Sequence, residues 1–95
     1  SPASTEFRLS AARRIRDIAK KTDSAGCFDP AYFLLLGALL ELGRIHDLDL
    51  ELSPNGPTLS YFPELDNSRH VSWLRFVRSV IDGNSENAEN FVQEG

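Results

Sequence analysis

A largely apolar stretch the size of a helix, FDPAYFLLLGALLELG at positions 28–43, constrains this chain more than any other feature. From Pro30 to Leu40 no side chain carries a charge, and apolar residues cover every face of a helix drawn through them. Such a helix either lies in a core or spans a membrane. Because a membrane span needs about 20 apolar residues and Glu41 ends this run, we predict a buried core helix. Gly37, in mid-helix, is predicted to allow close approach of another element.

A first helix is predicted from Leu9 to Thr22, where apolar residues recur at intervals of three and four. Ser10 is its expected N-cap, and Ile15 and Ile18 belong to the face predicted to pack. The opposite arc is basic and carries Arg13, Arg14, Arg16, Lys20 and Lys21. A turn at positions 23–26 follows, and Asp29 with Pro30 is a typical start for the core helix.

The hydrophobic period then changes from helical spacing to strict alternation. In DLDLEL, positions 47–52, leucine alternates with Asp or Glu, which is typical of a half-buried strand. Asn55-Gly56 is the strongest short hairpin signal, and TLSYF, positions 58–62, is the predicted return strand. A last amphipathic helix is predicted to begin between residues 66 and 68 and to run to Asp82, with Gly83 as its stop.

The predicted fold class is therefore α+β and mostly helical. It has two N-terminal helices, the second buried in the core, then a β-hairpin with an Asn-Gly turn, a third amphipathic helix and a short tail. We expect residues 1–8 to be a linker or tag remnant and residues 9–83 to be a single globular domain. Residues 84–95 form a polar acidic tail that either docks as a short helix or frays. Since the chain contains no methionine, we expect it to be a trimmed or excised piece.

The sequence contains no recognisable catalytic or metal-binding set. Nothing places His46 or His70 next to Cys27, so the thiol lacks a base and is interpreted as structural. The alternating carboxylates of positions 47–51 lack the spacing of a calcium-binding loop and are interpreted as a solvated face. Phosphate-binding glycine loops and Cys-x-x-Cys pairs are missing from the sequence. We therefore expect no enzyme, no cofactor and no bound metal.

Charge is distributed unevenly, although the formal net charge is only −4. Residues 1–26 hold six Lys and Arg against three acids, whereas residues 27–66 hold one Arg against seven acids. The basic arc of the first helix is either an ordinary solvated face or a contact for an acidic partner or a phosphate backbone. It could equally face the acidic strand of its own chain or of a second copy.

We expect a small non-catalytic protein–protein interaction domain that acts as an adaptor, a regulator or an inhibitor-type binder. Its aromatic residues lie on elements that cannot all face inward, and exposed aromatic residues mark recognition surfaces. The predicted partner-binding residues are Arg13, Arg14, Arg16, Lys20, Lys21, Phe62 and Trp73. The expected partner is another protein, with a homodimer as a further option.

The alternative function is nucleic-acid binding or transcription regulation by a winged-helix-like domain, which the order of helices, hairpin and helix resembles. The acidic strands and the absence of Lys and Arg from SPNGP, positions 53–57, argue against binding to nucleic acid. The single cysteine and the absence of a glycosylation sequon predict a cytoplasmic or other reducing intracellular location.

Overall fold

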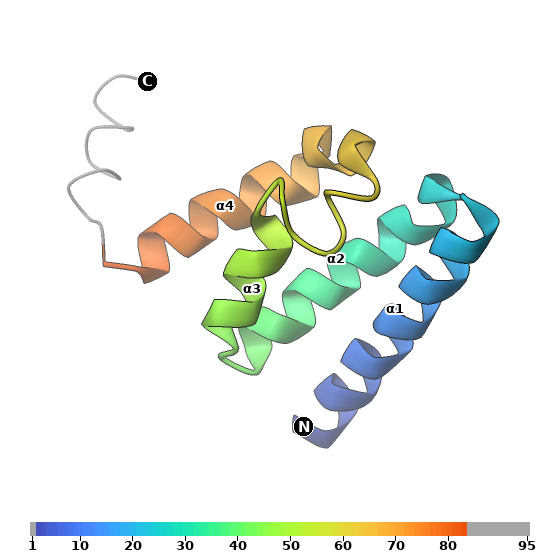
Figure 1. Cartoon of the computed structure of the whole chain (residues 1–95). Helices are drawn as coiled ribbons and strands as arrows, with labels where there is room; N and C mark the ends of the chain where they lie inside the picture. Colours follow the sequence, from blue (N-terminus) through green and yellow to red (C-terminus); the bar gives the residue numbers. More distant parts are fainter. Residues whose placement is uncertain (1, 84–95) are drawn as a thin grey trace.

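The computed structural model of the chain describes residues 2–83, and within them every regular element is helical. The elements are α1 (Pro2–Thr22), α2 (Ala25–Glu41), α3 (Ile45–Leu52), the 3-10 helix η1 (Pro63–Asn67) and α4 (Arg69–Ile81). Helices α1 and α2 run side by side in opposite directions, and α4 leads away from α1 (Figure 1). The predicted acidic tail, 84–95, lies outside the described residues.

Helix α2 is the central element, as its apolar composition predicts. It contacts α1, α3, η1 and α4, and Leu35, Leu36 and Leu39 are completely buried. The prediction of burial on every face is wrong for Phe33 and Leu34, which are 39% and 51% exposed. A helix at the centre of so small a domain still keeps one face at the surface, because the neighbouring elements do not surround it.

Two local predictions about α2 are also wrong. The helix begins at Ala25 and not at Asp29, so Pro30 lies inside it. A Cβ atom built on Gly37 would have no atom of a neighbouring element within 4 Å, so this glycine does not serve close packing. No helix among residues 2–83 combines the length and apolarity that a membrane span requires.

Helix α1 begins at Pro2, so the residues expected to be linker belong to the first helix, and Thr5 is buried there. Leu9, Ala12 and Ala19 are buried, but Ile15 and Ile18 are 39% and 60% exposed, so the predicted packed face is wrong at these two positions. Alanine at the contact lets two helices approach closely, and the two larger isoleucines are left toward solvent.

The predicted β-hairpin is wrong, because residues 2–83 contain no strand and the fold of this part is all-α. The alternating segment lies in α3, where Ile45, Leu48 and Leu52 also fit helical spacing. Leu48 and Leu52 are buried, whereas Leu50 is 46% exposed. Leucine and acidic residues favour strands only weakly, so packing against α2 decides for the helix.

The Asn-Gly pair is used for close packing and not for a hairpin turn. Helix α3 ends at Leu52, and its C-cap residue Ser53 is extended (ψ 136°), as expected of a residue that precedes proline. The loop then returns to α3, and a Cβ atom on Gly56 would lie 1.9 Å from the carbonyl oxygen of Leu50. The N–H of Gly56 donates to the carbonyl of Ser53 at 2.9 Å. Only glycine fits this contact without a shift of the backbone.

The predicted third helix is confirmed as α4. The hydroxyl oxygen of Ser68 accepts hydrogen bonds from the backbone N–H groups of His70 (3.0 Å) and Val71 (3.4 Å), which makes Ser68 the N-cap. Gly83 has a positive φ of 72° just beyond the helix, as expected of a C-terminal stop. Val71 and Leu74 anchor the inner face of α4 in the core.

Candidate protein-interaction surface

Arg16, one of the predicted partner-binding residues, forms its contacts with residues of the same chain. Its Nη1 lies 2.6 Å from Oε2 of Glu51 and 3.3 Å from Oγ1 of Thr58, and Thr58 donates to Oε1 of Glu51 at 2.7 Å. The side chains of Arg16 and Glu51 are only 15% and 7% exposed. This network joins α1 to α3 and to the loop that follows. Arg16 thus meets the acidic segment of its own chain, one of the alternatives that the charge pattern left open.

Tyr32 completes this buried polar cluster. Its hydroxyl donates to the backbone carbonyl of Glu51 at 2.5 Å. Burial, and secondarily the negative charge of Glu51, raise the pKa of the Tyr32 phenol above its usual value. The phenol therefore stays protonated and remains a donor. Each member of the cluster has a partner within it, so its arrangement is suited to holding helices together.

Two more of the predicted residues also have internal partners. The ammonium nitrogen of Lys20 lies 5.3 Å from the centre of the Tyr61 ring, and the Tyr61 hydroxyl donates to the backbone carbonyl of Lys20 at 2.9 Å. Phe62 is 2% exposed, and its ring centre lies 6.4 Å from that of Phe28 in the core. Phe62 is therefore a core residue.

Three of the predicted cations remain on the outer side of α1. Within residues 2–83 no carboxylate lies within ion-pair distance of Arg13, Arg14 or Lys21. Arg8, by contrast, is paired with Glu41 at 2.8 Å.

Exposed apolar side chains share this side of the helix with the cations. We define the α1 stripe as Phe7, Ala11, Arg14, Ile18 and Lys21, which follow one another at intervals of four and three and so lie on one face. Phe7 is 75% and Ile18 is 60% exposed. The stripe lies on the side opposite to the buried Leu9, Ala12 and Ala19.

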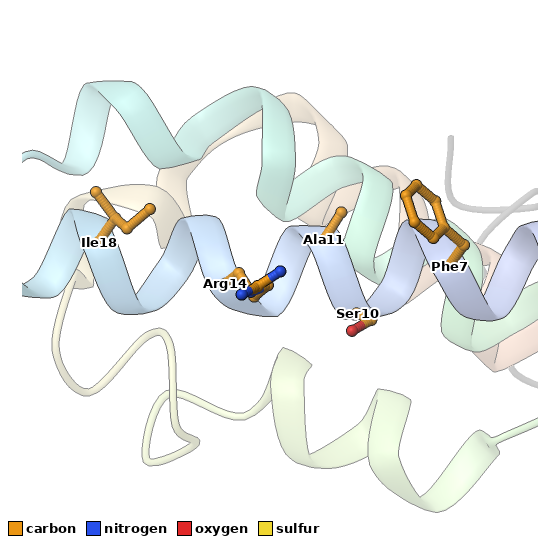
Figure 2. Close-up of a pocket in the computed structure, with 5 residues that line it drawn as sticks. All are labelled: Phe7, Ser10, Ala11, Arg14 and Ile18. Carbon is orange, nitrogen blue, oxygen red and sulfur yellow. The ribbon is translucent and has the colours of Figure 1, made fainter.

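The α1 stripe contains a shallow hollow of about 360 Å³. Figure 2 shows Phe7 and Ile18 at its two ends, with the small side chains of Ser10 and Ala11 between them and Arg14 beside the hollow. A large apolar side chain of a partner could enter between Phe7 and Ile18, while an acidic group next to it could reach Arg14.

Sequence reasoning missed the apolar half of this surface. Phe7 falls in the segment expected to be a linker, and Ile18 lies on the face predicted to pack. The regular spacing from Phe7 to Lys21 is a signal for this surface, because it repeats with the same helical period as the buried residues. Two apolar faces on one helix cannot both point at the core of a domain in which α1 packs mainly against α2.

A second exposed apolar surface lies on α4 and includes the predicted Trp73. Trp73 is 59% exposed, and its ring centre lies 6.0 Å from that of Phe76. This surface differs from the α1 stripe in charge, because the arginines of α4 at positions 75 and 78 pair with Asp66 and Asp49. Helix α4 also leads directly into residues 84–95, outside the described part of the chain.

The groups that could support other chemistry are scattered. Within residues 2–83 no three His, Cys, Asp or Glu side chains are grouped closely enough to hold a metal ion. Cys27 is exposed, with its sulfur 3.0 Å from the hydroxyl oxygen of Ser24, and His70 stacks on Phe33 with ring centres 4.3 Å apart. Comparison with protein-family models, curated proteins and solved structures gives no match.

Proposed function

We propose that this chain is a small non-catalytic protein–protein interaction domain that binds its partner through the α1 stripe. The observation that carries the proposal is the combination of exposed Phe7 and Ile18 with Arg14, which has no ion-pair partner within residues 2–83, along one helix face. Large exposed apolar side chains beside charged ones are typical of recognition surfaces. Partner binding removes the apolar side chains from water, and the charged side chains orient the partner.

Contacts with the rest of the fold hold α1, and with it the α1 stripe, in place. The opposite face of α1 is held to α2 by buried Leu9, Ala12 and Ala19, and the Arg16–Glu51 pair fixes it to α3. The stripe is therefore presented on a helix that has little freedom to move, which lowers the entropic cost of binding. The winged-helix alternative has lost its basis, since the hairpin on which it depended does not occur in the part of the chain that the structure describes.

The proposed place of action is a reducing intracellular compartment such as the cytoplasm. Its support is limited to the single cysteine, which is exposed and can form no disulfide within the chain.

The test uses the tagged full chain as bait in extracts of its source cells, with bound proteins identified by mass spectrometry. Ile18→Asp is expected to abolish recovery of the specific partner, because it places a charge in the apolar part of the stripe. The matched control is Ile81→Asp on α4, where the isoleucine is 49% exposed. Both variants must unfold at the temperature of the wild type. Recovery that survives Ile18→Asp, or that is lost only with Ile81→Asp, would contradict the proposal.

A further inference from the structure

The α1 stripe has a chemical character that restricts what can dock on it. Its surroundings are positive, since Arg13, Arg14 and Lys21 have no ion-pair partner within residues 2–83. The exposed Asp17 lies one helical turn from each of these three cations, so this part of the helix still carries an excess of positive charge. A partner that left these cations without acidic partners would lose much of the favourable electrostatic contribution to binding.

The apolar part of the stripe restricts the occupant further. From Phe7 to Lys21 the stripe covers 15 residues, or roughly 21 Å of helix. Its intervals of four and three match the seam of a helix–helix contact, in which apolar side chains of one helix insert between those of the other. The hollow above Ser10 and Ala11 is a place for one such side chain, because the small residues leave room between Phe7 and Ile18.

From these observations we infer that the α1 stripe binds an acidic amphipathic helix of a partner protein. This inference rests on the proposed function and names the chemistry of the partner. The partner helix places an apolar side chain in the hollow between Phe7 and Ile18. Glu or Asp residues that flank its apolar seam pair with Arg14 and with Arg13 or Lys21. A nucleic acid fits less well, because its phosphates would gain the cations but leave Phe7 and Ile18 without apolar contacts.

The test uses two synthetic helical peptides of about 21 residues, long enough to cover the whole stripe. Both have leucine at the seam positions and glutamine or alanine elsewhere. The four positions that flank the seam are Glu in one peptide and Lys in the other. Binding of each fluorescently labelled peptide to the full chain is followed by anisotropy, and the Glu peptide is expected to bind about tenfold tighter than the Lys peptide. The preference is expected to shrink when NaCl rises from about 50 to about 500 mM.

The decisive variant is Arg14→Glu, which is expected to abolish or reverse the preference for the Glu peptide. Arg69→Glu on α4 is the matched control, because Arg69 is also exposed and the change in net charge is the same. The control is expected to keep the preference. Circular dichroism melts of both variants verify that the fold is retained.

Four results would overturn the inference, the first three of which concern the peptides and the variants. They are the absence of binding by the Glu peptide, equal binding of both peptides, and an equal effect of Arg14→Glu and Arg69→Glu. Tight binding of a DNA duplex that competes with the Glu peptide would also overturn it. If partner recovery depends on Ile18 while the peptides show no charge preference, the proposed function holds and only the acidic chemistry of the partner is wrong.

Discussion

The clearest test of how this chain uses its charges is to replace Arg16 and Arg14, two residues apart on the same helix, by methionine. Arg16 lies 2.6 Å from Oε2 of Glu51, whose side chain is only 7% exposed. Arg14 is exposed and has no ion-pair partner within the described residues. Methionine keeps much of the length of arginine, so the change removes the charge and its hydrogen bonds more than the packing.

Arg16→Met is expected to lower the free energy of unfolding by about 3 kcal/mol. Removing one member of a buried ion pair typically costs about 3–5 kcal/mol, because the remaining charge is left without compensation. The lower end applies here for two reasons. Thr58 still donates to the Glu51 carboxylate at 2.7 Å, and the Nε of Arg16 is buried without a hydrogen-bond partner in the described part, so the wild-type pair is itself imperfect. Arg14→Met is expected to change the free energy by no more than about 0.5 kcal/mol.

The assay is urea denaturation followed by circular dichroism and by the fluorescence of Trp73, the single tryptophan of the chain. Coincident transitions from the two probes establish that unfolding is two-state. The double variant Arg16→Met/Glu51→Leu is expected to regain most of the lost stability, since no buried charge is then left unpaired. A cost below about 1 kcal/mol for Arg16→Met, or equal costs for Arg14→Met and Arg16→Met, would refute the assignment of Arg16 to the interior.

The remaining predictions concern packing in and around α2. Gly37→Ala is expected to stabilise the protein by about 0.5–1 kcal/mol, because alanine favours a helix and the new methyl group meets no atom of a neighbouring element within 4 Å. Gly56→Ala is expected to cost about 2 kcal/mol or more, because the same methyl group would overlap the Leu50 carbonyl. Leu39→Ala should cost about 2–5 kcal/mol, since Leu39 is 0% exposed. Urea melts measure all three changes. The same sign for both glycine variants, or a cost under about 1 kcal/mol for Leu39→Ala, would contradict these packing assignments.

The sequence alone determined the elements whose signals are local and mutually consistent. The apolar run predicted that α2 is the core helix, because few other environments suit a helix with apolar residues on so many faces. The limits of α4 also followed from the sequence, since Ser68 and Gly83 supply the N-cap and the positive φ that a helix needs at its ends.

Only the tertiary structure decided which secondary structure the segment from Ile45 to Phe62 adopts. Its leucines fit both a strand and a helix, and the choice depends on which surface of α2 they meet. Gly56 carried a hairpin signal, yet its role is set by the approach of the Leu50 carbonyl, a contact that local sequence does not encode.

Tertiary packing also decided which side of α1 forms the candidate interaction surface. Helix α1 has apolar and basic residues on more than one side, so its pattern allowed either Ile18 or Ala12 to face the core. Close packing against α2 selected the smaller residues and turned Ile18 outward beside Arg14, while Arg16 met Glu51. Sequence patterns fix how residues are spaced around a helix, but its rotation toward the core depends on the shape of its neighbours.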